Sequence, residues 1–474
     1  MSWSIKQFLE WKWIFLSCHS ITMSDALAES LNYASQKRRA VSSRSYRVKI
    51  SPVNGQNFKA GQTVNLDLPS SLSASYINWN QCYLRFKVTA ATNDLTVDKA
   101  ASCFISRVQC MTAGAQIFDC PSWNVLMNVL LDTDSSPGYK AGYGNILMGT
   151  QGSNPAGETL VADTARVFCV PFTLHPFGMS TPHRLMPLSS SAPVQFKLTL
   201  ASIQEAGYAA TAPTDLSFDE VELVCVFTEL SAAAEQQVMQ MNGGQFNILA
   251  NSWQAISTNM DAQSTAVTSN VGISVSSLER VLVVHRPTTS VIGQTFYSQS
   301  NRISNGLSEW SLLINGEQYP QRPIKVDGKG AECIAEYLLS DHSLVNFDKQ
   351  SSFNVAVAFD TASYNGLDAA SVGKVAPAPY TLAAASATGA SPGTAAAAGN
   401  IGSFFAGLEL ETGLSDGRSQ RLYSGISTIS STVNFRGIYA GGTSTVASEI
   451  TFFLGYTVLL SLNARGTNVW SISV

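Results

Sequence analysis

The pentapeptide Gly413-Leu414-Ser415-Asp416-Gly417 has the spacing of a G-x-S-x-G nucleophile elbow. In that motif the serine lies on a tight turn between a strand and a helix, beside a histidine base and an oxyanion hole. A strand-like run, Phe404–Glu411, precedes the pentapeptide, but the polar stretch 418–421 that follows has no apolar helix pattern. We therefore interpret this segment as a hairpin loop.

The remaining candidates for chemistry are scattered. No histidine pair has the spacing of H-E-x-x-H, and the sequence has neither a Walker loop nor G-x-G-x-x-G after a strand. The five histidines are His19, His175, His183, His285 and His342. His285 follows an apolar run and is expected at a strand end, whereas Asp132 and Asp134 are expected in the exit turn of a short helix. The sequence thus predicts no catalytic residue, no metal ligand and no cofactor, and indicates a protein that is not an enzyme.

The eight cysteines form no Cys-x-x-Cys pair. Several lie inside apolar, strand-like runs, such as Cys225 within 221–227. Buried free cysteines of this kind are typical of proteins made in a reducing compartment. The irregular spacing also argues against a disulfide framework.

Composition limits the function classes further. Charged residues make up 13% of the 474 residues, against about 25% in typical soluble domains. Such a surface suits a chain whose faces are buried against other subunits, although a weakly charged monomer is the alternative. The net charge of −4 argues against a protein that coats nucleic acid along its whole length. No apolar run reaches the about 20 residues of a membrane span.

Two segments repeat one local design: a strand, a Gly-x-Gln turn, and then a short amphipathic helix. The first copy contains Gly114 and Gln116, with Trp123 opening the helix. The second contains Gly316 and Gln318, nearly half the chain away. A unit that occurs twice at this separation indicates two similar domains rather than a solenoid.

Strand patterns dominate the rest. The runs Tyr83–Thr89, Val194–Leu200 and Phe353–Phe359 alternate between apolar and polar residues, and turn residues separate them. Because the strands do not alternate with helices, the sequence predicts an all-β chain of antiparallel sandwiches. We expect an N-terminal arm at 1–45, domains at 46–232 and 246–474, and a linker at 233–245. The uncharged Ala/Gly-rich loop 376–400 is expected on an outer face.

The N-terminal region differs from the domains. Residues 1–22 are rich in tryptophan and could form a helix on a membrane surface, or an extension upstream of a start at Met23. A basic stretch without acidic residues follows, made up of Lys37, Arg38, Arg39, Arg44, Arg47 and Lys49. Such an arm could contact phosphates or anionic lipid. A solvated linker, or an arm held under a neighbouring subunit, is the alternative.

Four motifs occur in an order that resembles the double jelly-roll major capsid proteins. This family joins tailless bacteriophages, adenoviruses, polinton-like elements and large nucleocytoplasmic DNA viruses. The motifs are the turn 114–119 before Trp123, Leu185–Leu188 before a strand, Ile314-Asn315-Gly316, and the closing strand Tyr456–Ser461. Ala115 stands where the family has a second glycine, and Phe118 where it has isoleucine.

The resemblance implies two consecutive antiparallel eight-stranded jelly rolls. It also implies trimers that form pseudo-hexagonal capsomers of an icosahedral shell, in a virion whose protein is made in the host cytoplasm or nucleus. The implied partners are further copies of the chain, penton and minor capsid proteins, and an internal membrane or genome reached by the N-terminal arm. A single jelly roll with a protruding β domain, and a two-domain β-sandwich hydrolase or carbohydrate-binding protein, are the alternatives.

Overall fold

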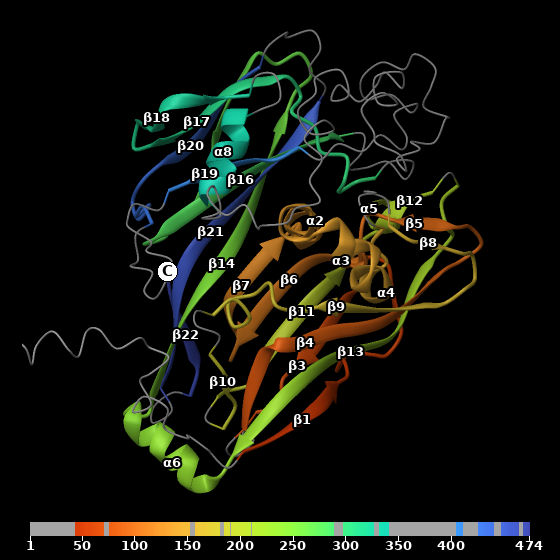
Figure 1. The fold of residues 1–474 in the computed structure, drawn as a ribbon, viewed down its shortest axis with the longest axis vertical. Helices are drawn as coiled ribbons and strands as arrows, with labels where there is room; N and C mark the ends of the chain where they lie inside the picture. The colour runs from red at the N-terminus through yellow and green to blue at the C-terminus, as the bar shows by residue number, and fades with distance from the viewer. Residues whose placement is uncertain are drawn as a thin grey trace, which may run out of the picture. The chain divides into compact units, whose positions relative to one another are not determined.

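The computed structural model describes twelve stretches of the chain. These are residues 43–70, 75–151, 157–180, 184–189, 191–209, 211–288, 297–326, 331–340, 404–410, 425–439, 447–463 and 468–474. Strands predominate in them, and the strands of the first half and those of the second half form separate sheets (Figure 1).

Two sheets form the first half. One has the core order β1 (Ser43–Ile50), β13 (Leu216–Leu230), β4 (Ser75–Ala90) and β9 (Arg166–Pro171). The short strands β2 (Phe58–Lys59) and β10 (Met186–Pro187) pair with its central strands. The other sheet has the order β3 (Thr63–Asp67), β11 (Val194–Leu200), β6 (Ile105–Thr112) and β7 (Ala115–Pro121).

The second half repeats this arrangement. One sheet has the order β14 (Gln245–Met260), β21 (Ser448–Asn463), β16 (Leu278–Pro287) and β19 (Ala406–Glu409), with β22 (Trp470–Ser473) beside β21. The other has the order β15 (Ala266–Asn270), β20 (Val433–Tyr439), β17 (Leu307–Ile314) and β18 (Glu317–Lys325).

The strand orders of the halves correspond one to one. Numbering the core strands of each half along the chain, the first, eighth, third and sixth form one sheet. The second, seventh, fourth and fifth form the other, in both halves. This confirms the predicted fold of two consecutive antiparallel eight-stranded jelly rolls. The alternative of one jelly roll with a different second β domain is therefore wrong.

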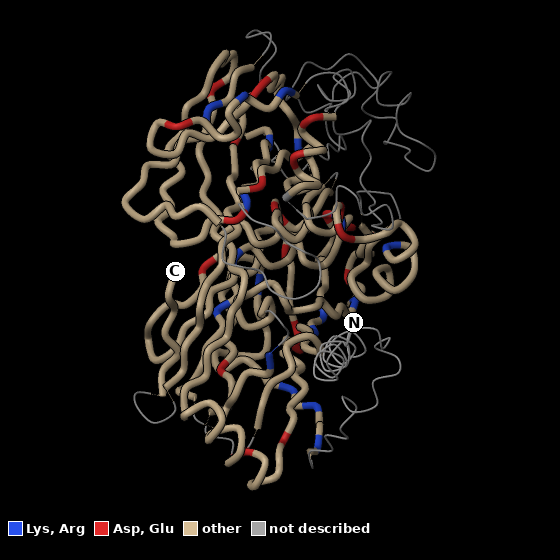
Figure 2. The backbone as a smooth tube through the Cα atoms, turned by 60° about the vertical axis from the view of Figure 1, so that its left-hand side comes forward, with Lys and Arg blue, Asp and Glu red and all other residues tan. Residues whose placement is uncertain are grey.

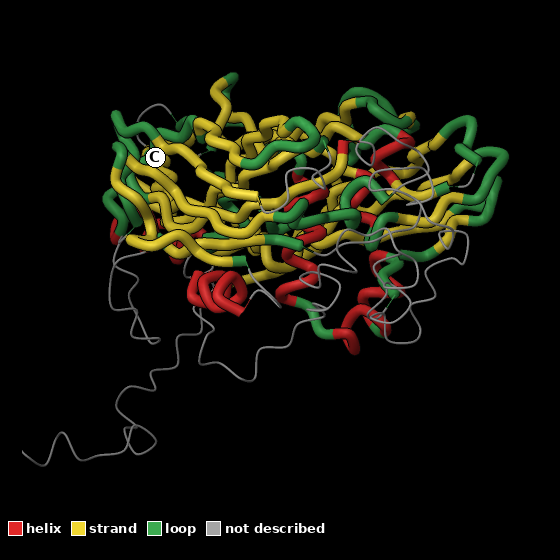
Figure 3. Tube along the Cα trace, turned by 90° about the horizontal axis from the view of Figure 1, so that it is seen from above, coloured by secondary structure: helices red, strands yellow, loops and turns green. Residues whose placement is uncertain are grey.

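Several short elements lie outside these sheets. A small sheet contains β12 (Gly207–Tyr208), β5 (Leu95–Val97) and β8 (Thr159–Leu160). The helices are η3 (Ala101–Phe104), α2 (Trp123–Asp134), α3 (Pro137–Ala141), α4 (Tyr143–Met148), α5 (Ile203–Ala206), α6 (Ala232–Met241) and α8 (Ala331–Ser340). Several of them lie along one side of the strands (Figure 3). Within the described ranges, no helix is long and apolar enough to cross a membrane.

The hydrophobic pattern explains the strand positions. In β11 every second residue is buried, and Phe196 and Leu198 of this set stand opposite Cys110 and Val108 of β6. A shift of one residue would turn this apolar set toward solvent, so the core fixes the register. β21 differs, because nearly all of its residues are buried. A strand covered on both faces is expected to be apolar almost throughout. Charged residues are sparse along the described backbone as a whole (Figure 2).

Both Gly-x-Gln turns have one backbone geometry. Thr112 pairs with Ala115 across the first hairpin, and the two residues between them, Ala113 and Gly114, have φ of 45° and 85°. In the second hairpin, Asn315 and Gly316 have φ of 52° and 84°. Positive φ at both central residues defines a type I′ turn, which suits the twist of the flanking strands.

The sequence analysis did not predict one of the helices. The predicted linker 233–245 overlaps α6, which connects β13 to β14 (Figure 1). The hydroxyl of Ser231 caps this helix by accepting a hydrogen bond from Ala234 N at 3.3 Å. No residue of α6 is fully buried, and the helix accordingly lacks the apolar periodicity that predicts a packed helix. The signals available in the sequence were the serine at its N-cap and the run of alanines that follows.

Replacing Gly316 by alanine is expected to destabilise the protein by about 1 kcal/mol, because an L side chain is strained at positive φ. No atom lies within 4 Å of the added Cβ, so the strain alone is tested. The control is Gly138→Ala in α3, where the nearest atom to the added Cβ is Ser136 Oγ at 3.8 Å. Thermal unfolding should show a lower midpoint for Gly316→Ala only; equal midpoints would contradict the turn argument.

Candidate functional site at the junction of the two jelly rolls

The C-terminal strand forms one contact between the jelly rolls. The ring of Trp470 on β22 packs edge-on against Phe177 of the first half, with ring centroids 5.2 Å apart. Its indole N–H donates to Ser191 Oγ at 3.0 Å. Trp470 is 1% exposed. An aromatic ring buried with its N–H paired contributes both apolar area and direction to such a contact.

Asp132 forms the centre of a second contact, which is ionic. The sequence analysis placed this residue in the exit turn at the end of a short helix; it lies in the last turn of α2 itself and is 4% exposed. Its carboxylate forms ion pairs with Lys99, with Lys140 at 3.0 Å, and with Arg302. Lys99 and Lys140 belong to the first half and Arg302 to the second, so one carboxylate joins both.

Asp98 makes a matching contact with the backbone of the second half. Its Oδ2 accepts hydrogen bonds from Gln299 N at 2.6 Å and from Ser300 N at 3.3 Å. The hydroxyl of Ser300 donates to the other oxygen. The Gln299 side chain in turn donates to the carbonyl oxygens of Cys103 at 3.2 Å and Glu205 at 2.8 Å.

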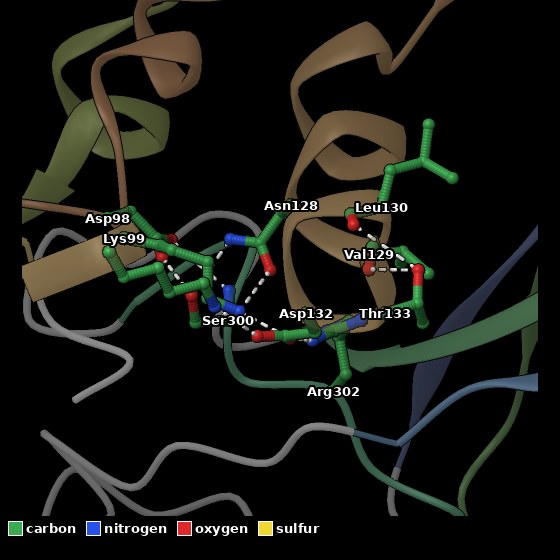
Figure 4. Close-up of polar contacts among 10 residues, drawn as sticks. Asp98, Lys99, Asn128, Val129, Leu130, Asp132, Thr133, Ser300 and Arg302 are labelled. Carbon is green, nitrogen blue, oxygen red and sulfur yellow. Dashed lines mark hydrogen bonds and ion pairs between the residues drawn. The ribbon is translucent and has the colours of Figure 1, made fainter. Parts of the chain in front are cut away.

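Asn128 links the two carboxylate groups into one network. Its Oδ1 accepts from Lys99 Nζ at 3.2 Å, and its Nδ2 donates to Ser300 Oγ at 2.9 Å. Asn128 and Asp132 are four residues apart on α2, so both side chains lie on the same face of the helix. Figure 4 shows them meeting Lys99, Ser300 and Arg302 there. We refer to Asp98, Lys99, Asn128, Asp132, Lys140, Ser300 and Arg302 as the junction network.

Burial shifts the pKa values of the network's charged groups, and their neighbours oppose or add to these shifts. Burial alone would raise the pKa of Asp132, but Lys99, Lys140 and Arg302 together lower it well below its usual range. Burial lowers the pKa of Lys99 to about 7, against the opposing effect of Asp132. Burial also raises the pKa of Asp98. Arg302 is fully buried, and its Nε and Nη1 have no hydrogen-bond partner in the described part of the chain.

The predicted basic arm divides between two environments. Lys37, Arg38 and Arg39 lie outside the described residues. The other three belong to β1, where Arg44 pairs with Glu229 at 2.6 Å and Lys49 with Glu222 at 2.9 Å, both on β13. Arg47 is exposed. Two of the six cations therefore pair with glutamates of the first sheet rather than with an external anion.

The predicted signature turns lie at equivalent hairpins. Gln116 stands opposite Met111 and Gln318 opposite Leu313. In both hairpins the glutamine lies two residues after the glycine, and its partner lies three residues before that glycine. Gln116 Nε2 donates to Asp119 at 3.3 Å. Trp123 opens α2, is fully buried, and donates its indole N–H to Leu174 O at 3.2 Å. Their role as a fold signature stays a prediction.

The other candidates for chemistry have structural surroundings where they are described. His285 lies inside β16, not at its end as predicted, and its Nε2 is 3.0 Å from Tyr439 OH. His175 is also buried. The seven cysteines of the described ranges are free thiols. In those ranges, no group of three or more His, Cys, Asp or Glu side chains could hold a metal. The pentapeptide 413–417, the loop 376–400, His19, His183 and His342 lie outside them.

The sequence analysis missed the junction network. Asp98 and Lys99 are adjacent in the chain, and Ser300 and Arg302 lie in a polar run at 298–302, but neither segment has a periodic pattern. The only available signal was the presence of charged residues in a chain that has few of them. Nothing in the sequence indicated which of these residues, far apart in the chain, would come into contact.

We compared the chain with known proteins and solved structures. No protein-family model and no curated protein matches the sequence. VP54 of PBCV-1, fitted into a cryo-EM reconstruction of the virophage Sputnik, matches with a TM-score of 0.56 and 12% identity over 92% of this chain and 98% of that one. The Faustovirus major capsid protein matches with a TM-score of 0.52 and 8% identity, over 90% of this chain and 91% of that one. This chain therefore has the double jelly-roll fold found in these capsid proteins.

Replacing Asp132 by asparagine should destabilise the protein by about 3–5 kcal/mol, because buried cations lose their common partner. The matched control is Asp119→Asn, which removes the partly exposed pair with Arg107 and should cost about 1 kcal/mol or less. Urea unfolding at neutral pH measures both. Equal losses in the two variants would show that the junction network contributes no more than a surface ion pair.

Stability should fall below about pH 6.5. Burial lowers the pKa of both His175 and His285 to about 3 in the folded protein. The unfolded chain therefore takes up protons near the ordinary histidine pKa that the folded chain does not. The stabilisation is complete above pH 6.5 and is lost progressively toward pH 3, by up to about 1.4 kcal/mol per histidine and pH unit.

Urea titrations at pH 6.5 and 5.0 test this dependence. The two histidines together should lower the free energy of unfolding by up to about 4 kcal/mol over this interval. The variant His285→Gln should lose about half of that dependence, since glutamine does not titrate. An unchanged dependence in the variant would exclude His285 as a source.

Proposed function

We propose that this chain is a major capsid protein that self-assembles into trimeric, pseudo-hexagonal capsomers of an icosahedral shell. The observation that carries the proposal is the identical strand order of the two jelly rolls. A hexagonal tile made of three chains requires two similar lobes per chain. The fold is also that of the PBCV-1 and Faustovirus capsid proteins.

A tile of this kind also needs lobes that keep one relative orientation. The junction network and the Trp470 contact supply this through side chains that are almost completely buried. Buried charges tolerate little displacement, because a lost partner leaves a charge uncompensated. The low charged fraction of 13% supports flanks that are covered by other subunits.

The proposed role is structural rather than catalytic. A β-sandwich hydrolase or carbohydrate-binding protein would need a cleft lined by aromatic side chains or carboxylates. The buried carboxylates Asp98 and Asp132 instead contact backbone and cations of the same chain. Their contacts support the capsid hypothesis over this alternative.

We further propose the domain limits 46–232 and 246–474, with an arm at 1–45 that faces the genome or an internal membrane. Penton and minor capsid proteins are the further partners proposed. Since Arg44 and Lys49 pair with glutamates of β13, we assign contact with external anions to Lys37, Arg38 and Arg39.

Size-exclusion chromatography with light scattering tests the capsomer. The expected mass is three times that of one chain at micromolar concentration. The variant Asp132→Asn should give fewer trimers, whereas the control Asp119→Asn should match the wild type. A wild-type protein that stays monomeric would refute the proposed function.

Removing residues 1–42 tests the arm without touching β1, which begins at Ser43. We expect trimers at the wild-type level but fewer closed particles in electron micrographs. Replacing Lys37, Arg38 and Arg39 by glutamine should have the same effect if charge is responsible. Loss of trimers in either variant would contradict an inward-facing arm.

A further inference from the structure

Two cysteines face each other across the first sheet. Tyr83 of β4 pairs with Val224 of β13 in the antiparallel ladder. One step further along both strands are Cys82 and Cys225, where the ladder is interrupted before it resumes with Asn78 opposite Val226. The adjoining pair Tyr83 and Val224 brings the two cysteines side by side at this interruption. Opposed residues of an antiparallel ladder have Cα atoms about 4.5–5.5 Å apart, and a disulfide spans Cα distances of about 4.4–6.8 Å.

Their side chains also point to the same face. Leu84 and Leu223, the next pair along this ladder, are both fully buried. Side chains alternate along each strand, so the residues two positions away lie on this same core face. Cys82 and Cys225 are 3% and 0% exposed and belong to the same apolar cluster.

The two sulfur atoms interact directly. The Cys225 thiol is the main group that acts on the ionisation of Cys82, and Cys82 acts on that of Cys225 in turn. The contact with Cys225 lowers the pKa of Cys82 below its ordinary value, although burial opposes this. When protonated, Cys82 donates to Asn78 O at 3.1 Å. The pKa of Cys225 is instead raised, by its contact with Cys82 and by burial.

We propose that Cys82 and Cys225 form a reversible disulfide between β4 and β13 when the folded protein meets hydrogen peroxide. This site does not depend on the proposed capsid function. Peroxide is small and neutral, and Cys82 adjoins the exposed residues Asn80 and Gln81. The reaction begins at Cys82, because its neighbours on β4 give it the shorter path from solvent.

In the overall reaction, two thiols and one hydrogen peroxide molecule give one disulfide and two water molecules. The Cys82 thiolate attacks one peroxide oxygen, so that an S–O bond forms, the O–O bond breaks, and hydroxide leaves with a solvent proton as water. The sulfur of Cys225 then attacks the resulting sulfenic acid as its own proton departs. The S–S bond forms, the S–O bond breaks, and the second water leaves. Two electrons pass from the sulfurs to the peroxide.

The chain contains an internal control pair. Cys110 stands opposite Phe118, and Cys120 opposite Val108, on the adjacent strands β6 and β7. These cysteines are thus diagonal neighbours, at about 7–8 Å, beyond the usual reach of a disulfide. Burial alone raises the pKa of Cys110 far above its ordinary value. This pair should stay reduced under conditions that oxidise Cys82 and Cys225.

The test exposes the full-length protein to hydrogen peroxide and then blocks remaining thiols with iodoacetamide in denaturant. Peptide mass spectrometry should find Cys82 and Cys225 in one cross-linked peptide pair that dithiothreitol separates, and Cys110 and Cys120 alkylated. The oxidised protein should also unfold at a higher temperature, because a closed loop restricts the unfolded chain. Absence of the linked pair in oxidised wild-type protein would overturn the proposal.

Variants test the order of events. In Cys225→Ser, the reaction should stop at the Cys82 sulfenic acid, which dimedone traps. In Cys82→Ser, Cys225 should stay unoxidised, and in the control Cys110→Ser the yield of the cross-link should equal that of the wild type. Oxidation of Cys225 in the Cys82→Ser variant would contradict attack by Cys82. The wild-type experiment needs no substitution, so it decides the main point even if a variant fails to fold.

Discussion

The need to neutralise Asp132 and its cations inside the protein constrains how the two jelly rolls meet. A buried carboxylate costs several kcal/mol to desolvate, and only well-placed partners offset that cost. Asp132 finds these partners in Lys99 and Lys140 of its own half and Arg302 of the other. Since Arg302 is fully buried, a rotation of one half that separated it from Asp132 would leave a buried charge without its partner. The junction network therefore favours one relative placement of the two rolls.

Rigidity matters because each lobe alone is a complete sandwich. Eight strands in the same order form each roll, and type I′ hairpins at Gly114 and Gly316 close equivalent strand pairs. In the proposed trimer, two such lobes on a flexible tether could not present six regular positions. The helix α2 serves both needs, because Trp123 packs it into the first roll while Asp132 connects it to the second. In this way the first copy of the repeated strand–turn–helix unit contributes to the junction between the rolls, through Asp132 of its helix.

Prediction from the sequence succeeded where local pattern and tertiary packing agree. The strand Val194–Leu200 appears with the predicted bounds, since alternation along a half-buried strand leaves a period of two. The helix α2 begins at the predicted Trp123. The helix α6 was missed because it buries no residue completely, and His285 was misplaced because its strand continues for two residues after it.

The sequence by itself determined the all-β class, the duplication and the two turns, because strand alternation and the need for positive φ at Gly114 and Gly316 act over a few residues. Only the tertiary structure decided which charges and thiols meet. Asp98 reaches Ser300, Asp132 reaches Arg302, and Cys82 faces Cys225 across long intervals of chain. No local pattern encodes such pairs, since strand register and the docking of the two rolls bring them together. The charges and the thiols become neighbours only once the sheets have formed.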